Sequence, residues 1–315
     1  MALTCKQQQE KIEETVLQPI DQWVQKQEQQ CRNEPCNWWM LCLNKLFCWI
    51  VWTMLKITLW VTTLVVRWVY RTVCTLVSLV VGLVALIFGN VEIIKQALGD
   101  LWELVKDAFY TIVGAAIYGA IYIVDGIQSI LRIQEKKRRL TERERGILWK
   151  VFRNSLNYNA ISIVDGNAGL LSVSGRAFTM GFNIYMPSYN ETTLVHECVH
   201  VWQFQFEGTK YIGNSALNQF DSMFISKGYK PYSWVNSISA SNSWYTLKSV
   251  EAQAQFIEDV FTDGEFVFID KTILPDKTPG AFFKEEKETG HNKFEYKGVD
   301  FTGIANEAWR IIRTG

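Results

Sequence analysis

Two histidines and a glutamate in the stretch His196-Glu197-Cys198-Val199-His200 have the spacing of a metal site, H-E-x-x-H. On a helix, residues four apart lie on one face, so both imidazoles can point at the same ion. Zinc lowers the pKa of a bound water to about 7, which gives a nucleophile at neutral pH. Glu197 lies beside the histidines, where it can take the proton from that water. The spacing therefore predicts zinc-assisted hydrolysis, with a peptide bond as the expected target.

The residues around the motif predict the helix that it requires. Ser188-Tyr189-Asn190-Glu191 fits a capping box at the start, and Gly208 is a suitable stop. A helical period of apolar residues is formed by Val195, Val199, Trp202 and Phe206. Cys198 is expected to pack, whereas His196, His200 and Gln203 lie on another face. The helix thus has one face for a core and another for chemistry.

A third ligand must come from elsewhere in the chain, because a catalytic zinc keeps three protein ligands and one open position. Glu251 is preferred, because it opens Glu251-Ala252-Gln253-Ala254-Gln255, whose small residues allow two helices to pack closely. Glu207 lies on the ligand face but about 10 Å beyond His200 along the axis, which is too far. The alternative ligands are Glu258, Asp221 and His291.

The chain also resembles known zinc peptidases. H-E-x-x-H followed by a helix with E-x-x-A is similar to the gluzincin branch. Further stretches resemble a bacterial family of metallopeptidase domains that often occur beside polymorphic toxins and contractile injection systems. These stretches are Leu140-Thr141 with Glu144 ahead of Phe152, Ala177–Gly181, Ile184-Tyr185 and Leu194–Gln203.

The resemblance covers roughly residues 140–260 and implies an α+β zincin-like metallopeptidase domain, with a strand over Phe178–Met186 lining the cleft. It implies that His196, His200 and Glu251 are the metal ligands and that Glu197 is the base. Gln255 stands where related gluzincins often have Asp, which is a departure from the family pattern.

Oxyanion stabilisation has two candidate residues, Tyr245 and Tyr211. A packing role is the alternative for each of them, and the sequence does not decide between the two roles.

The first half of the chain is strongly apolar. From Pro35 to Val91 there is no Asp or Glu, and six of the 13 tryptophans lie there. Positions eleven residues apart stack along one helical face, as Lys45, Lys56 and Arg67 do. We therefore expect an all-α hydrophobic helical hairpin, with helices over residues 38–88 and 91–134 joined at Gly89-Asn90.

Two uncharged runs in this hairpin, Thr72–Phe88 and Ala108–Val124, have 17 residues each, which is close to the length that spans a bilayer. Basic residues precede the first run and follow the second, and the segment between them is acidic. This pattern favours a hairpin with both ends, and the domain that follows, on the cytoplasmic side of a membrane. The alternative is a hairpin packed in a soluble assembly, with self-association through residues 38–134.

Buried charges in such a hairpin are expected to be paired. Folding the chain at Gly89-Asn90 brings Arg71 near Asp107 and Lys56 near Asp125.

Composition divides the chain into a polar Gln-rich segment (1–37), the hydrophobic hairpin as membrane anchor (38–139) and a zinc metallopeptidase domain (140–315). The last part opens with a capping box from Thr141 to Glu144.

No secretory signal peptide is expected, because the first apolar run begins late. Six of the seven cysteines precede residue 75 without any C-x-x-C, so reduced, buried thiols are expected. A net charge of zero gives no indication of a nucleic-acid partner.

These features predict a zinc-dependent endopeptidase that acts on a protein or peptide and is tethered to, or inserted in, a membrane by its helical hairpin. One alternative is a toxin or effector that is secreted into a target cell, with the peptidase as its payload. The other is a catalytically inactive structural or adaptor protein. Glu197 argues against this last alternative, because metal binding alone does not need a glutamate between the two histidines.

Overall fold

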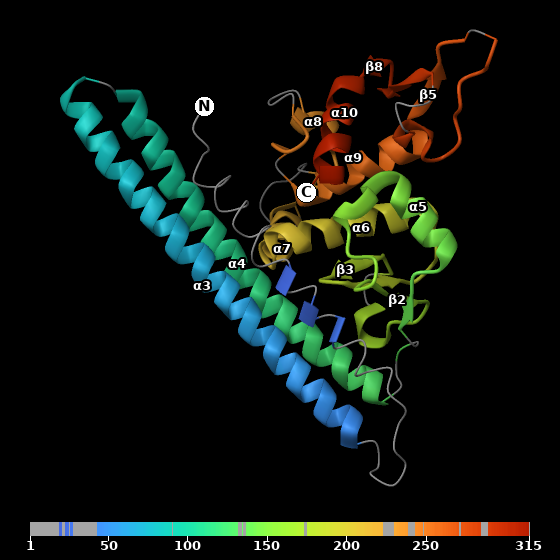
Figure 1. Cartoon of the computed structure of the whole chain (residues 1–315), viewed down its shortest axis with the longest axis horizontal. Coiled ribbons are helices and arrows are strands. Elements are labelled where there is room, and N and C mark those ends of the chain that lie inside the picture. Colours follow the sequence, from blue (N-terminus) through green and yellow to red (C-terminus); the bar gives the residue numbers. More distant parts are fainter. Residues whose placement is uncertain are drawn as a thin grey trace. The chain divides into compact units, whose positions relative to one another are not determined.

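The computed structural model describes residues 19–20, 23–24, 26–27, 43–89, 91–131, 134, 137–172, 175–222, 230–238, 243–247, 249–270, 272–284 and 289–314. The fold is mixed α+β, with a pair of long apolar helices followed by shorter helices and short strands (Figure 1). The chain forms two compact units, Met1–Ala108 and Phe109–Gly315. The boundary falls inside the second long helix, whereas composition alone places a boundary near residue 140.

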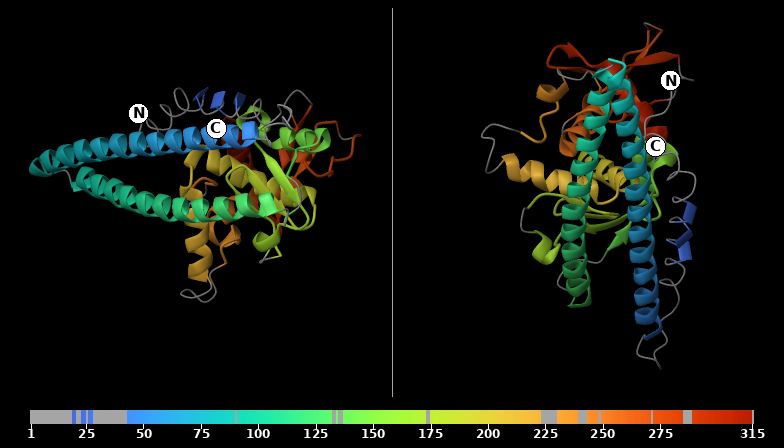
Figure 2. Two further views of the ribbon diagram at one scale, coloured as in Figure 1. Left: turned by 90° about the horizontal axis from the view of Figure 1, so that it is seen from below. Right: turned by 90° about the vertical axis from the view of Figure 1, so that its left-hand side faces the viewer.

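The two long helices are α3 (Leu43–Ile87) and α4 (Val91–Leu131). Residues 38–42, where the first helix was expected to begin, lie outside the described residues. The second helix ends at Leu131, three residues before the expected Gln134. Gly89 has a φ of 78°, a left-handed conformation that suits glycine at the predicted turn. Within the first unit, α3 and the beginning of α4 run antiparallel (Figure 2).

Side chains within the first unit pair as the hairpin predicts. Arg71 on α3 forms an ion pair with Asp107 on α4, and both side chains are largely buried. Gly82 lies close to the backbone of Ile94, so the helices approach each other there. By contrast, large apolar side chains along α3 are more than half exposed; they include Val69, Val73, Leu76, Val77, Val80 and Leu83.

Two helical stretches, Trp68–Ile87 and Val91–Gln128, are long and apolar enough to cross a membrane. The windows that define them are only 11% and 6% buried, which is far less than for a core helix of a globular domain.

Cys74 in the hairpin and Cys198 in the H-E-x-x-H motif are in different states. Cys74 is disulfide-bonded, so the expectation of a reduced thiol is wrong at that position. Cys198 is free and buried, as expected. The side chain of Lys56 lies outside the part of the chain that the structure describes, so its pairing with Asp125 stays a prediction.

The second part of α4, from Phe109, packs as an integral helix of the second unit. It crosses α7 (Lys210–Phe220) so closely that a Cβ on Gly114 would lie 1.8 Å from the carbonyl oxygen of Thr209. Only glycine fits this close approach at Gly114. Gly119 has no atom within 4 Å of an added Cβ. One face of the expected second span is thus covered by protein.

A four-stranded sheet lies in the second unit. Its strands are β1 (Arg138–Arg139), β2 (Ser162–Asp165), β3 (Phe178–Met180) and β4 (Asn183–Met186), in the order β1-β2-β4-β3. Strands β2 and β4 are parallel, and the other pairs are antiparallel. The expectation of one strand over Phe178–Met186 is wrong, because the chain turns at Gly181 (φ 66°) and pairs β3 with β4. The turn makes β3 an edge strand.

Further helices of the second unit are α5 (Glu142–Phe152), α6 (Glu191–Glu207), α9 (Val250–Asp263) and α10 (Thr302–Thr314). The predicted capping box of α5 is present, with Thr141 and Glu144 each bonded to the other's backbone N–H. The N-cap of α6 is Asn190 and not Ser188. Gly208 ends α6 as predicted.

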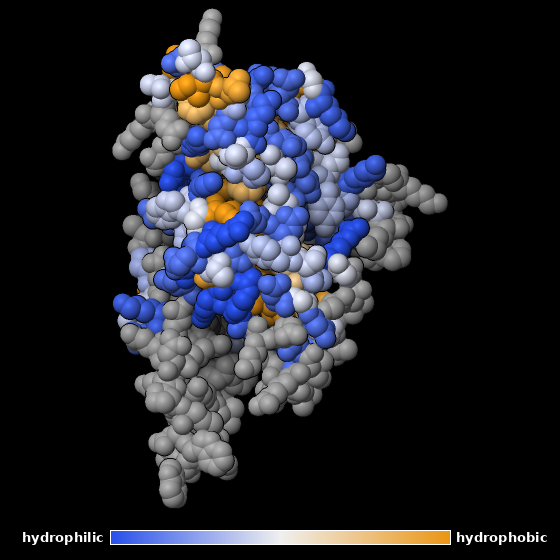
Figure 3. Space-filling model, turned by 90° about the vertical axis from the view of Figure 1, so that its right-hand side faces the viewer, coloured by the Kyte–Doolittle hydropathy of each residue, from blue (hydrophilic) through white to orange (hydrophobic). Residues whose placement is uncertain are grey.

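Shorter elements complete the second unit. They are the 3₁₀ turns Arg153–Ser155, Gly169–Ser172 and Ala281–Phe283, helix α8 (Val235–Ile238), and strands β5 (Glu265–Phe268), β6 (Gly290–Lys293), β7 (Glu295–Tyr296) and β8 (Val299–Asp300). The core consists of apolar residues of α5, α6, α9, α10 and the sheet, among them Phe152, Ile184, Val199, Phe256 and Ile312. On the face drawn in Figure 3, hydrophilic residues predominate and apolar residues form small patches.

Candidate metal centre

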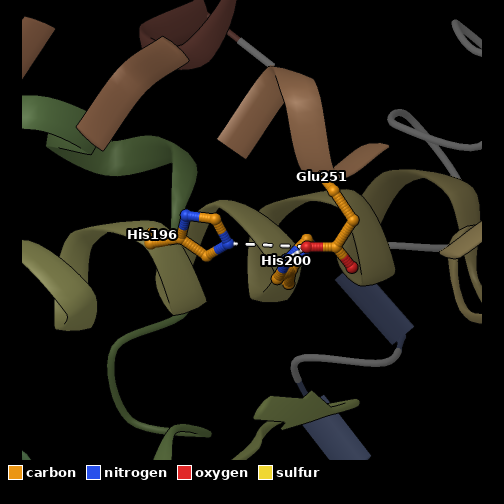
Figure 4. A group of neighbouring side chains, drawn as sticks. All are labelled: His196, His200 and Glu251. Carbon is orange, nitrogen blue, oxygen red and sulfur yellow. Dashed lines mark hydrogen bonds and ion pairs between the residues drawn. The ribbon is translucent and has the colours of Figure 1, made fainter. Parts of the chain in front are cut away.

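Helices α6 and α9 bring together the three residues that the sequence assigned to one ion. His196 and His200 lie one turn apart on α6, and Glu251 projects from the first turn of α9 (Figure 4). Ala252 and Ala254 are almost fully buried, and such small side chains let α9 approach α6 closely. The two histidines and Glu251 are only 5–6% exposed.

The carboxylate of Glu251 lies at similar distances from the two histidines. Oε2 of Glu251 lies 3.6 Å from Nε2 of His196 and 3.2 Å from Nε2 of His200. Ligand atoms about 2.1 Å from a tetrahedral zinc are about 3.4 Å apart, and the two measured distances bracket that value. One ligand atom from each residue lies within 4.8 Å of the others, so this buried group can hold a metal ion.

Hydrogen bonds on the outer ring nitrogens orient both imidazoles. Nδ1 of His196 lies 3.0 Å from Oε2 of Glu258, and Nδ1 of His200 lies 2.7 Å from Oε1 of Gln203. The Gln203 amide is itself fixed, because its nitrogen donates to Gln253 and to the carbonyl of Val250. Since both outer nitrogens are engaged, each Nε2 is directed at Glu251. Such partners of metal-bound histidines set the tautomer and the ring orientation.

The other oxygen of Glu251 is held from α7. Ser215 donates its hydroxyl to Oε1, and Nε2 of Gln219 lies 3.4 Å from the same atom. Ser249 caps α9 by accepting a hydrogen bond from the backbone N–H of Glu251. These contacts leave Oε2 as the oxygen that faces the histidines.

Glu197 is 4% exposed and is fixed by the edge strand of the sheet. Thr179 on β3 places its hydroxyl 2.8 Å from Oε2 of Glu197. Burial raises the pKa of Glu197, and this effect outweighs the nearby histidines and the Thr179 hydrogen bond, which lower it. A raised carboxyl pKa suits a general base at neutral pH.

The charges around the group favour a cation. Burial lowers the pKa of His196, but hydrogen bonds to Glu251 and Glu258 outweigh it and raise the pKa to about 10. Burial likewise lowers the pKa of His200, yet the charge of Glu251 raises it above its ordinary value. The same carboxylates that favour a charged imidazole also favour a metal cation between the histidines, and metal binding competes with protons for the ring nitrogens.

The two tyrosines considered for the oxyanion lie in different surroundings. Tyr211 is buried, its ring stacks on His200 with centroids 5.8 Å apart, and its hydroxyl donates to the carbonyl of Thr179. Tyr245 is 36% exposed, and its carbonyl accepts a hydrogen bond from Gln253. The oxyanion role stays a prediction for both. A third tyrosine, Tyr232, which the sequence does not mark, lies near the first histidine, with its ring centroid 6.1 Å from that of His196.

The alternative ligands occupy other positions. Glu258 contacts the outer nitrogen of His196 rather than completing the group. Asp221 caps α7, and His291 is exposed on β6. Among the described residues, neither joins the metal-binding group. Gln255 donates to Asp259, so the partner of His196 comes from Glu258, one turn further along α9.

Comparison with protein-family models, with curated proteins and with solved structures finds no match. The geometry of the buried His/His/Glu group and of its partners therefore carries the functional conclusion.

Proposed function

We propose that this protein is a zinc-dependent endopeptidase of the gluzincin type. The observation that supports it most strongly is the group of His196, His200 and Glu251 with tetrahedral spacings, beside the buried carboxylate of Glu197. A histidine pair with one glutamate is a known ligand set of catalytic zinc, and it leaves a position open for water or substrate. A purely structural zinc would have four protein ligands.

The residues of the chain have distinct tasks in this reaction. Zinc, when bound, supplies an acidified water and polarises the scissile carbonyl. Glu197 accepts the proton of the attacking water and passes it to the leaving amine. Thr179 holds one oxygen of Glu197, so the carboxylate is oriented before the substrate arrives. Glu258 and Gln203 keep the histidines in position.

The arrangement of elements also supports a zincin-like domain. The motif helix α6 lies against the edge strand β3, which contributes Thr179, and α9 contributes the third ligand. The resemblance of residues 140–260 to bacterial metallopeptidase domains that occur beside toxins and injection systems motivates the same proposal. An effector role, with the peptidase as payload, is the second candidate, because the exposed apolar face of α3 can insert into a target membrane.

Metal analysis and proteolysis test the proposal together. Purified protein should contain about one zinc per chain, and His196→Ala or His200→Ala should remove it. Glu197→Gln should keep the metal and lose cleavage of a peptide library, because it removes a base and not a ligand. Glu207→Gln, at the end of the same helix, serves as the control. Folded wild-type protein that takes up no zinc would contradict the proposal.

The proposal places the hairpin of the first unit in a membrane and the catalytic unit, which includes α4 from Phe109, on the cytoplasmic side. Single cysteines at Glu92 and Thr314, on a background without native cysteines, should then be labelled from opposite sides of sealed vesicles. Labelling of both positions from the same side would rule out a two-span hairpin without affecting the zinc site.

A further inference from the structure

A cleft of about 440 Å³ opens on the second unit. Two cationic side chains, Arg176 and Lys230, line it together with four polar residues and Pro231. No carboxylate is among the described residues that line it. Arg176 precedes β3, Lys230 precedes α8, and both residues are exposed, so segments far apart in the sequence bring these two positive charges to one cleft.

Two lining residues connect this cleft directly to the metal-binding group. The ring of Tyr232 lies 6.1 Å from that of His196. Gln219 places its amide nitrogen 3.4 Å from Oε1 of Glu251. A peptide residue spans roughly 3.3–3.6 Å when extended, so a substrate with its scissile bond at the metal group extends into the cleft within a few residues.

The cleft carries cationic side chains, whereas carboxylates surround the histidines of the metal-binding group. Around the histidines lie three carboxylates, those of Glu197, Glu251 and Glu258. The cleft presents Arg176, which is hydrogen-bonded to Tyr232, and Lys230. A guanidinium recognises a carboxylate through two parallel hydrogen bonds, and an ammonium adds a point charge. The cleft therefore attracts a substrate carboxylate.

We propose that this cleft is a specificity subsite that binds a carboxylate of the substrate, contributed by an Asp or Glu side chain within a few residues of the scissile bond. The inference rests on the proposed peptidase function for the identity of the ligand as a peptide. A carboxylate can also come from the C-terminus of the peptide, and the experiment separates these two sources.

The test measures peptide binding to the full-length Glu197→Gln protein loaded with zinc, so that no cleavage is needed. Fluorescent peptides carry Glu, Gln or Lys at each position in turn, and each is made with a free and with an amidated C-terminus. At one or two neighbouring positions, Glu should bind about fivefold more tightly than Gln, the factor expected for partly exposed ion pairs. Amidation of the C-terminus should leave this ratio unchanged.

Variants of Arg176 and Lys230 test whether these two cations cause the preference for Glu. Arg176→Gln or Lys230→Gln should reduce the ratio of Glu to Gln binding, and the double variant should bring it to about one. Replacing both residues with Glu should reverse the preference in favour of Lys. Arg310→Gln, which removes an exposed cation from α10 outside the cleft, is the control and should keep the ratio.

Two results would overturn the inference. One is a ratio that stays the same in the double variant. The other is a preference that depends on the free C-terminus and on no side-chain position. The proposed peptidase function fails separately, if the wild-type protein binds acidic peptides with the expected preference and cleaves none of them.

Discussion

Gln203 lies one turn beyond His200 on α6, and its carbonyl oxygen is 2.7 Å from Nδ1 of that histidine. The first histidine of the motif has a charged partner in the corresponding place, because Glu258 lies 3.0 Å from Nδ1 of His196. A neutral amide fixes the tautomer of one ligand, whereas a carboxylate also increases the electron density of the other. The two histidines are therefore oriented by partners of different charge, supplied by α6 and by α9.

Removing the neutral partner should weaken metal binding. In Gln203→Leu, Nδ1 of His200 loses its acceptor, and we expect the zinc affinity to fall about 10- to 100-fold, as is usual when such a partner is removed. Competition with a chelator of known affinity measures the change. Glu258→Gln keeps an acceptor oxygen near His196 and should lose less. Equal affinity of Gln203→Leu and wild type would show that the hydrogen bond does not orient the ligand.

The hydroxyl of Thr179 should matter for turnover and not for metal content. Thr179→Val removes the hydrogen bond to Oε2 of Glu197 with little change in volume. A hydrogen bond to a charged group contributes about 1.5–3 kcal/mol, so kcat should fall roughly 10- to 100-fold. Thr179→Ser should recover most of the activity. A variant that loses zinc as well would show that the side chain supports the fold of the site instead.

The fold near the site was only partly predictable, for physical reasons. The helix of the motif, its apolar stripe and its stop at Gly208 follow from local periodicity and capping, and they are present. Glu251 could also be predicted as the third ligand, because its small neighbours indicate close packing of two helices. Thr179, by contrast, is brought to Glu197 by the β3–β4 turn, and nothing in the local pattern marks which residue of an extended run will face a helix.

The partners of the two histidines could be predicted from the sequence to different extents. Gln203 was recognised on the ligand face, because it follows His200 by three residues, yet its role requires the amide contacts from α9. The sequence indicates Glu258 only as an alternative metal ligand. Glu258 lies two turns beyond Glu251 on α9. The crossing of α6 and α9 determines that Glu258 contacts Nδ1 of His196 and that Glu251 contacts Nε2 of His200, and local sequence does not encode this crossing.

The buried carboxylate of Glu144 should make stability depend on pH. Burial raises its pKa, but hydrogen bonds from Arg138 and Thr141 outweigh this and hold the pKa below the ordinary value of 4.5. A lowered folded-state pKa stabilises the protein fully above that value, and the contribution is lost as the pH falls through the lowered pKa. Glu144→Gln should therefore cost about 2–3 kcal/mol at pH 7, and its gap from wild type should narrow below pH 4.5.

Chemical denaturation of the two proteins at several pH values measures this gap. Glu142→Gln, at an exposed position in the first turn of the same helix, is the control and should show a small effect at every pH. A gap for Glu144→Gln that does not depend on pH would contradict the ionic role of the carboxylate.

The second part of α4 should be required for the catalytic unit to fold. Ile117, Tyr118 and Ile121 pack against the apolar cluster that contains Tyr185, and the hydroxyl of Tyr185 donates to Asp125 at 2.8 Å. A chain that begins at Leu140 exposes this cluster and leaves the tyrosine without its acceptor, so it should aggregate. A chain that begins at Phe109 keeps these contacts and should yield more folded, zinc-binding protein. If a chain that begins at Leu140 is stable and active, the domain boundary lies near residue 140, as composition indicates.

The ion pair between Arg71 and Asp107 should stabilise the hairpin only while both partners are present. The side chains are 17% and 14% exposed, so removing one charge takes an ion-pair partner from a largely buried charge. Breaking a buried pair costs about 3–5 kcal/mol, whereas replacing both members with apolar residues is often neutral. Asp107→Leu and Arg71→Leu should therefore each lower the unfolding temperature in detergent, and the double variant should recover most of the loss.

Recovery in the double variant distinguishes a pair from two independent charges, because independent losses would add. If the double variant is less stable than either single variant, the two residues do not pair and α3 and α4 are held in register by other contacts, such as the approach at Gly82.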